Sequence, residues 1–334
     1  MSNLKPDKPE AAGFVVENPG PHSLIQDSGR RGVLHLGLTS AGPMDKLTYD
    51  WANRLCGNLA GTAALEITFG GLAVRASAAT RIVLCGPPVE CTHNGKPVDI
   101  WQGLDLASGD KLAIGHVHSG CRLYLAVRGG FQVVQVFGSA ATVVREGLGG
   151  VEGRALQRGD FLHFPEHGAR QNLGADSRKR FSLPDYLRPD YPAADDSVHT
   201  LRVIPCLDAR HIPRQEKLHF FSQVYSVSND INRMGYRLEG KALAFKTGAI
   251  LSQGIAPGTI QIPPNGQPIV LMRDHPTIGG YPKIGVLLSA DMNRLAQLQP
   301  GAKLRFVPIT VNRAQQALRM AKQSYESTCP IVLQ

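Results

Sequence analysis

The sequence contains no long apolar run, because none of its apolar stretches approaches the roughly 20 residues that a membrane-spanning helix needs. We therefore expect no membrane partner. The first residues are rich in Lys, Pro, Asp and Glu and have no apolar core, so we expect no secretory signal. The six cysteines are scattered and form no C-x-x-C pair, which argues against a disulfide framework. Reduced thiols in a cytoplasmic protein are the expectation.

Long clusters of one charge are also absent. The chain has 36 Lys and Arg residues against 27 Asp and Glu, which gives a net charge of +9. Only Arg30-Arg31 and Arg178-Lys179-Arg180 stand together, and such dispersed basic residues are typical of a solvated surface. We therefore expect no nucleic-acid partner. The positive charge supports, at most, a weak attraction of small anions.

Motifs for binding phosphate, biotin and metal are missing or incomplete. The chain has no G-x-x-x-x-G-K-[ST] loop and no Met-Lys-Met biotinylation site, so we expect no biotin attached to it. Residues 147–153 nearly imitate a dinucleotide fingerprint, but no βαβ pattern surrounds them, and we interpret them as a turn. His116 and His118, near Cys121, lack the carboxylate and third histidine that would complete a metal site, so no metal is expected.

Glycine and proline are abundant, at 36 and 23 residues, and they interrupt the chain every few positions. This spacing is typical of short strands joined by turns, so we expect a mainly β fold. The candidate strands are 81–85, 111–115, 121–127, 160–164, 201–205, 248–252 and 303–309. A polar, proline-rich stretch at 174–197 predicts a linker between two β-rich parts, at 14–195 and 198–330.

Two segments have the pattern of helices. Residues 45–57 begin at the N-cap residue Asp45, carry apolar side chains at helical spacing and end at Gly57. Residues 310–327 carry an apolar stripe, which we expect to pack on the edge of a domain.

Residues 252–285 are the most informative segment of the chain. Two apolar runs at 259–262 and 268–272 flank a Pro-Pro-Asn-Gly-Gln turn, which predicts a hairpin. The second run is followed by Asp274, and hydroxyl, phenol and ammonium groups come next, around Gly279-Gly280. Glycine lets the backbone turn sharply and approach a ligand closely, so we expect this loop to line a site.

Four further blocks are IQDSGR at 25–30, SAGPMD at 40–45 followed by ANRL at 52–55, LEITFGG at 65–71 and SNDINRMGYRL at 228–238. With residues 252–285, these blocks resemble the family of the C subunit of bacterial ATP-dependent 5-oxoprolinase. The family also includes allophanate hydrolase subunit 2, KipA and biotin-dependent carboxyltransferase domains. The resemblance covers residues 14–326. It departs from the family at His275 and at Pro276, where the family usually has Gln.

The resemblance implies two cyclophilin-like β-barrel subdomains with a few short helices. It implies an enzyme subunit that is inactive alone and works with a B-type subunit, like allophanate hydrolase subunit 1 or KipI, and an A-type LamB/YcsF subunit. The complex would hydrolyse 5-oxo-L-proline to L-glutamate at the expense of ATP, and whether this chain contacts ATP stays open. One alternative is carboxyl transfer to urea or a related amide, with carboxybiotin delivered by another protein. Another is a KipA-type regulatory protein that antagonises a kinase inhibitor.

Three residues are expected to carry the chemistry. Asp274 is interpreted as a general base or as an acceptor for the substrate amide, and a turn-capping aspartate is the alternative. Arg233 offers a planar fork for a carboxylate or phosphate, with a surface salt bridge as the alternative. Thr277 supplies a hydroxyl in the same loop. We expect Arg233 and the loop to face one cleft without supporting the core.

Seven further residues are expected to contact a small anionic amide substrate: Ser40, Asp45, Glu66, Gln261, Tyr236, Tyr281 and Lys283. Ser40 and Asp45 bracket a turn into a helix, and helix N-termini attract anions, although both residue types are also routine caps. Glu66 and Gln261 each alternate with apolar neighbours in a strand, so their side chains face away from the core. Glu66 therefore points either to solvent or into a site.

Overall fold

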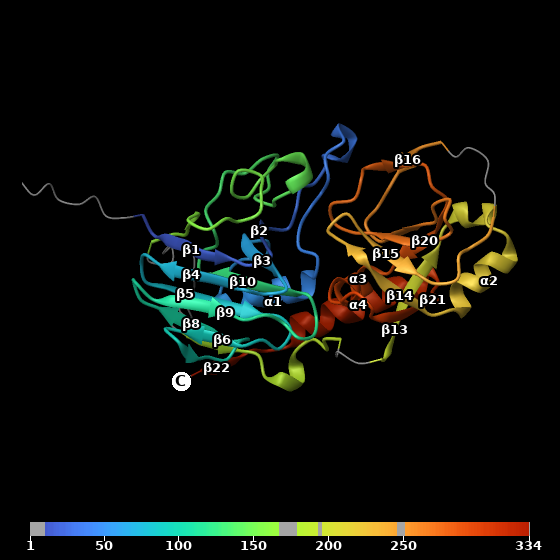
Figure 1. Cartoon of the computed structure of the whole chain (residues 1–334). Coiled ribbons are helices and arrows are strands. Elements are labelled where there is room, and N and C mark those ends of the chain that lie inside the picture. The colour runs from blue at the N-terminus through green and yellow to red at the C-terminus, as the bar shows by residue number, and fades with distance from the viewer. Residues whose placement is uncertain (1–10, 167–178, 193–195, 246–250, 334) are drawn as a thin grey trace, which may run out of the picture.

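The computed structural model describes residues 11–166, 179–192, 196–245 and 251–333. It shows a mainly β protein with two lobes side by side (Figure 1). The helices of the described ranges are α1 (Lys46–Cys56), α2 (Arg214–Ser222), α3 (Ser289–Ala296) and α4 (Val311–Ser327). The expectation of a mainly β fold with a few short helices is thus confirmed.

The first lobe is built from two sheets that pack face to face. One has the order β11-β1-β4-β9-β6-β7 and the other β2-β3-β10-β5-β8. The strands are β1 (Gly13–Pro19), β2 (His22–Gln26), β3 (Ala64–Thr68), β4 (Leu72–Ala76), β5 (Thr80–Cys85), β6 (Cys91–His93), β7 (Lys96–Pro97), β8 (Gly103–Leu106), β9 (Lys111–Ile114), β10 (Arg122–Val127) and β11 (Phe161–His163). Alternate residues such as Leu65 and Ile67 fill the core between the sheets.

Helix α1 covers the outer face of the second sheet. Trp51 and Leu55 of the helix pack with Val83 of β5 and Tyr124 of β10 in a second buried cluster. Strand β10 is buried along its whole length, because the other sheet covers one face and α1 the other. The helix ends as predicted: Asp45 accepts a hydrogen bond from Thr48 N, and the chain leaves through a left-handed glycine.

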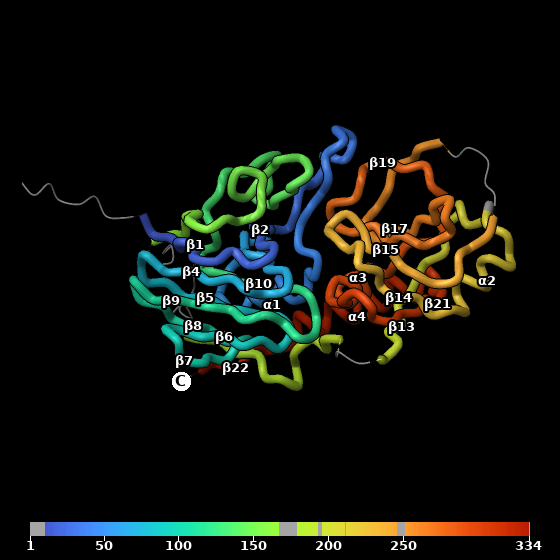
Figure 2. The backbone as a smooth tube through the Cα atoms, viewed as in Figure 1, coloured from blue at the N-terminus to red at the C-terminus, as the bar shows by residue number. Residues whose placement is uncertain are grey.

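The second lobe is a closed barrel with the strand order β13-β20-β17-β18-β15-β14-β21. Its strands are β13 (Val198–Pro205), β14 (Tyr225–Ile231), β15 (Gly235–Glu239), β17 (Thr259–Gln261), β18 (Ile269–Leu271), β20 (Lys283–Leu287) and β21 (Lys303–Pro308). The predicted hairpin is present, since β17 and β18 pair antiparallel with Ile260 opposite Val270. A small two-stranded sheet of β16 (Gln253–Gly254) and β19 (Ile278–Gly279) lies above the barrel strands in the view of Figures 1 and 2.

The last helix corrects one expectation. Its N-cap Thr310 is as predicted, but Val311 and Leu318 of the apolar stripe are exposed. Only part of the stripe packs: Ala314 is buried, and at the far end of the helix the ring of Tyr325 lies 4.8 Å from that of Trp51 in α1 of the first lobe. The chain then forms β22 (Ile331–Leu333), which pairs with β12 (Arg180–Ser182) beneath the first lobe (Figure 1).

The predicted linker is described only in part, because residues 174–178 and 193–195 lie outside the described ranges. Its described residues 179–192 are packed: they form β12, bury Leu183 and bring Tyr191 Oη within 2.7 Å of Thr48 Oγ1. The division of the chain at 195 and 198 stays a prediction.

Strands β5, β9, β10, β11, β13 and β21 match six predicted strands. The strand expected at 248–252 falls partly outside the described ranges, and residues 251–252 are not in a strand. All six cysteines are free thiols. In the described ranges no helix is long and apolar enough to cross a membrane.

Candidate functional site at the junction of the lobes

Glu66 and Arg233 form a buried ion pair where the lobes meet. Glu66 is in the middle of β3 and points away from the core, as its alternation with Leu65 and Ile67 predicts. It does not reach solvent, because Arg233, from the turn between β14 and β15, places Nη1 2.5 Å from Glu66 Oε1. Only 1% of Glu66 and 6% of Arg233 are exposed. Burial opposes ionisation of Glu66, but the nearby arginines outweigh it and hold the pKa of the carboxyl below its ordinary value.

Asp274 completes this arrangement from the loop that follows β18. Arg233 donates from Nε and Nη2 to the two oxygens of Asp274, at 2.8 and 2.9 Å, and from Nη2 to Gly42 O at 2.8 Å. The guanidinium thereby joins β3, the turn before α1 and the loop after β18. Arg233 and Asp274 are thus in direct contact, while the expectation that Arg233 and the loop face one cleft stays a prediction. The expectation that neither supports the core is wrong, because both are buried and link the lobes.

A second layer of hydrogen bonds holds Glu66 from the other side. Tyr124 Oη donates to Glu66 Oε2 at 2.7 Å, and Met44 N donates to the same oxygen at 2.8 Å. Arg122, also in β10, donates from Nη1 to Tyr236 Oη at 2.6 Å. Tyr236 is fully buried, and its hydroxyl is part of this network.

Asp45 lies at the edge of the same network. Its Oδ2 accepts hydrogen bonds from Thr48 Oγ1 at 2.6 Å and from Gln297 Nε2 at 2.8 Å. Burial raises the pKa of Asp45, although the bonds from Gln297 and Thr48 oppose the shift. Asp45 is therefore both the helix cap that its position predicted and a buried link between α1 and the segment after α3.

The other predicted residues lie outside this network. Gln261 is buried, and its Nε2 has no hydrogen-bond partner in the described residues. Lys283 Nζ is 2.8 Å from Gln253 Oε1 and 3.1 Å from Asp208 Oδ2. Thr277 is partly buried and its carbonyl accepts from Ile255 N at 3.0 Å, whereas Tyr281 is exposed.

Ser40 is partly buried, and its carbonyl oxygen accepts a hydrogen bond from Arg30 N at 2.7 Å. Figure 2 shows this blue segment after β2 beside the green segment that follows β10, where Arg30 Nη2 donates to Ala141 O at 2.7 Å. These two segments form the upper wall of the first lobe near the junction.

Gly279 of the double glycine does not make the sharp turn that the sequence predicted, but it has close side-chain neighbours. Gly279 does not have a positive φ angle. A Cβ atom there would lie 2.7 Å from Gln261 Nε2 and would also clash with Ile255. A side chain at 279 would therefore make the ends of the Ile255 and Gln261 side chains move away from the loop.

Sequence reasoning missed three residues of the junction. Arg122 and Tyr124 lie in a strand that is otherwise apolar, and an arginine inside a buried strand was the available signal. Arg273 precedes Asp274, and its Nε is buried without a hydrogen-bond partner in the described ranges.

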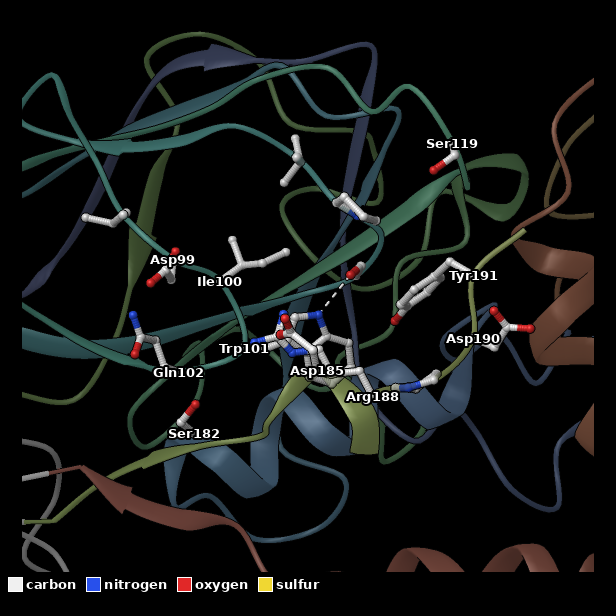
Figure 3. Close-up of a pocket in the computed structure, with 15 residues that line it drawn as sticks. Asp99, Ile100, Trp101, Gln102, Ser119, Ser182, Asp185, Arg188, Asp190 and Tyr191 are labelled. Carbon is white, nitrogen blue, oxygen red and sulfur yellow. Dashed lines mark hydrogen bonds and ion pairs between the residues drawn. The ribbon is translucent and has the colours of Figure 1, made fainter. Parts of the chain in front are cut away.

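A hollow of about 890 Å³ lies elsewhere, between the first lobe and residues 182–191. In Figure 3 Trp101, Arg188 and Tyr191 line it, and Trp101 Nε1 donates to Gly86 O at 2.9 Å. None of the predicted site residues lines this hollow. Asp45 alone among them lines a neighbouring hollow of about 490 Å³ that shares residues 189–191. Within the described ranges, no three His, Cys, Asp or Glu residues are grouped to hold a metal.

Comparison with known proteins gives one family match. The model of a family described as "Carboxyltransferase domain, subdomain A and B" matches residues 36–308. The C subunit of 5-oxoprolinase from Escherichia coli K12 is 35% identical over 309 residues, which cover 92% of this chain and 94% of that protein. The C subunit of 5-oxoprolinase from Haemophilus influenzae is 32% identical over 87% of this chain and 90% of that protein.

Among solved structures, urea amidolyase of K. lactis superposes with a TM-score of 0.89 at 27% identity. The match covers 97% of this chain but only 20% of that much longer one. Both lobes are therefore arranged as in that enzyme.

Proposed function

This chain belongs to the carboxyltransferase domain family, and on that premise we propose that it is the C-type subunit of an ATP-dependent 5-oxoprolinase. The observation that supports this most is the match to the C subunit of the E. coli enzyme, which extends over 92% of one chain and 94% of the other. The chain would act in the cytoplasm with a B-type partner, like KipI or allophanate hydrolase subunit 1, and an A-type LamB/YcsF partner, and would be inactive alone.

The proposed reaction follows from the weak electrophilicity of a lactam. The carbonyl oxygen of 5-oxoproline takes the γ-phosphoryl group of ATP: a new O–P bond forms, the bond to the β-phosphate breaks, and ADP leaves. Water then adds to the activated carbon and the C–N bond breaks, which gives the acyl phosphate of the open chain with its free amino group. A second water hydrolyses the acyl phosphate, and phosphate and L-glutamate are released. This chemistry requires cations for the substrate carboxylate and an acceptor for the lactam N–H.

The junction network offers such an acceptor. Asp274 uses two lone pairs for Arg233, and a carboxylate has about four, so it keeps capacity to accept a hydrogen bond from a lactam N–H. Arg233, in contrast, already donates four hydrogen bonds to Asp274, Glu66 and Gly42. We propose that Arg233 holds the catalytic carboxylate in place, and that Thr277 and the loop to Lys283 border the substrate.

A second candidate function is carboxyl transfer to urea or a related amide. The TM-score of 0.89 to the K. lactis urea amidolyase favours it. In that case carboxybiotin would arrive on another protein, because this sequence has no biotinylation site. The same carboxylate would then accept an N–H of the acceptor amide.

Reconstitution separates these proposals. The chain is mixed with B- and A-type subunits, and release of phosphate and glutamate is measured with 5-oxo-L-proline and ATP. We expect turnover by the three together and none by the chain alone. Carboxylation of urea when a biotin carboxylase and a biotin carrier are supplied, without 5-oxoproline turnover, would favour the second candidate. Binding to a KipI-like protein without either reaction would favour a regulatory role.

A further inference from the structure

Arg273 differs from the two other arginines at the junction. Arg122 and Arg233 are buried and donate to tyrosine, carboxylate and carbonyl oxygens. Arg273 makes no hydrogen bond or ion pair with any residue in the described ranges, and its Nε is buried without a partner. The residue as a whole is partly buried.

The carboxylates that interact electrostatically with Arg273 already have hydrogen-bond or ion-pair partners. Glu66 and Asp45 act on Arg273, and Arg273 acts in turn on Asp50. Glu66 is bound by Arg233 and Tyr124, Asp45 accepts from Thr48 and Gln297, and Asp50 is 2.5 Å from Lys46 Nζ. Arg273 is therefore a cation whose neighbouring anions are occupied.

This arrangement is energetically unfavourable without a ligand. Burial lowers the pKa of the Arg273 guanidinium, yet an arginine stays protonated in proteins. A partly desolvated charge without a partner costs free energy, and an incoming anion would offset that cost. The planar guanidinium fork matches the two oxygens of a carboxylate, so a small carboxylate is the ligand that fits best.

The position of Arg273 is also suitable for a substrate. It directly precedes Asp274, the proposed amide acceptor, and begins the loop that returns over β17 to Lys283. Gln261 Nε2, a second buried donor without a partner in the described ranges, lies under the same loop against Gly279. Arg273 Nε at the start of the loop and Gln261 Nε2 beneath it are thus two buried donors without a partner in the described ranges.

We propose that Arg273 binds the carboxylate of the substrate and selects anionic over neutral amides. This inference rests on the proposed function and names the residue that recognises the substrate charge. An oxyanion could also come from the phosphates of ATP, so the experiment compares both sources.

The first experiment measures binding to the isolated full chain by calorimetry. The probes are sodium 5-oxo-L-prolinate and, separately, inorganic phosphate. We expect saturable binding of the carboxylate, weakened roughly tenfold or more by Arg273→Met and less by Arg273→Lys, which keeps the charge but loses the fork. The matched control is Arg237→Met, because Arg237 is exposed and its ion pair in the described residues is with Asp230, at 2.5 Å. Equal binding by wild type and Arg273→Met, or no binding by wild type, would overturn the proposal. Tighter binding of phosphate than of the carboxylate would overturn it as well, and would indicate that Arg273 binds the phosphates of ATP.

The second experiment uses the reconstituted complex with 5-oxo-L-proline and the neutral 2-pyrrolidinone. We expect Arg273→Met to lower kcat/KM for the anionic lactam roughly tenfold or more and to leave the slow rate with the neutral lactam and the KM for ATP unchanged. An equal loss with both lactams, together with a lower Tm, would mean a structural role and would overturn the proposal. If the wild-type complex does not hydrolyse 5-oxoproline, the proposed function fails, while the binding experiment still decides the role of Arg273.

Discussion

Glu66 and Arg233 are 167 positions apart in the chain, and their side chains meet at 2.5 Å between Oε1 and Nη1 in the buried seam between the lobes. One charge comes from a strand of the first lobe and the other from a turn of the barrel. Both are buried, so the loss of either charge would leave the other with less compensation in the low-dielectric interior. The seam is consequently part of the folded core and also carries the candidate site.

Replacing Arg233 by Met should destabilise the protein strongly. The change leaves Glu66 and Asp274 buried without their cation, and breaking a buried pair in this way costs about 3–5 kcal/mol. Urea unfolding gives the free energy of unfolding, and Arg237→Met is the surface control, expected within about 0.5 kcal/mol of wild type. Wild-type stability in Arg233→Met would contradict a structural role for this guanidinium.

Asp274→Asn should reduce activity beyond its effect on folding. The amide keeps the shape of the side chain and removes the acceptor charge, so we expect a loss of roughly 2–4 kcal/mol of transition-state stabilisation, about 30- to 1000-fold in kcat/KM. The measurement is the rate of the reconstituted complex at a temperature where circular dichroism shows the variant to be folded. A folded variant with the wild-type rate would remove Asp274 from the chemistry.

Acidification should destabilise the chain partly through His275. This side chain is fully buried, and burial lowers its pKa from the ordinary 6.5. Below pH 6.5 the unfolded chain takes up a proton that the folded chain resists, so stability is retained above that pH and falls as the pH drops. Denaturation midpoints are compared at about pH 7.5 and about pH 5.5, where an unperturbed histidine changes charge.

The matched variant for that measurement is His275→Gln, which should show a smaller loss between the two pH values. His22 should contribute part of the remaining slope, because burial lowers its pKa as well. The same slope in wild type and variant would show that His275 is not responsible.

Tyr325→Ala should loosen the end of α4. The Tyr325 ring packs on Trp51, and the guanidinium of Arg54 lies 5.0 Å from the centres of both rings. Because Tyr325 is only partly buried, we expect a loss of about 1–3 kcal/mol, below the cost for a fully buried aromatic residue. Thermal unfolding tests this, with the exposed Met320→Ala of the same helix as control. Equal stability of the two variants would mean that the helix end is not anchored by the ring.

Local patterns in the sequence predicted the fold better than the site. The hairpin at β17 and β18 and the caps of α1 depend on neighbouring residues, so turn chemistry and alternation were enough to find them. The partner of Arg233 could not be found this way, because the barrel has to dock on β3 before Glu66 and Arg233 meet. The sequence indicated that Arg233 binds an anion. It could not indicate that carboxylates of the protein itself already accept the hydrogen bonds of its guanidinium.

Arg273 shows that neighbours in the sequence can also suggest a contact that the structure does not contain. Beside Asp274 in the sequence it resembles half of a local ion pair, yet Asp274 pairs with an arginine 41 positions away. Only the three-dimensional contacts show which of the two cations retains free donors in the described residues.

The pairing of β12 with β22 has a consequence for how such a protein can be divided. The strand before the barrel and the strand after it pair in one small sheet on the first lobe. The barrel is therefore inserted in the chain between two strands that belong to the first lobe. A gene cut between the lobes would separate two strands that belong together. Swapping barrels between relatives would therefore require two junctions, one after β12 and one before β22.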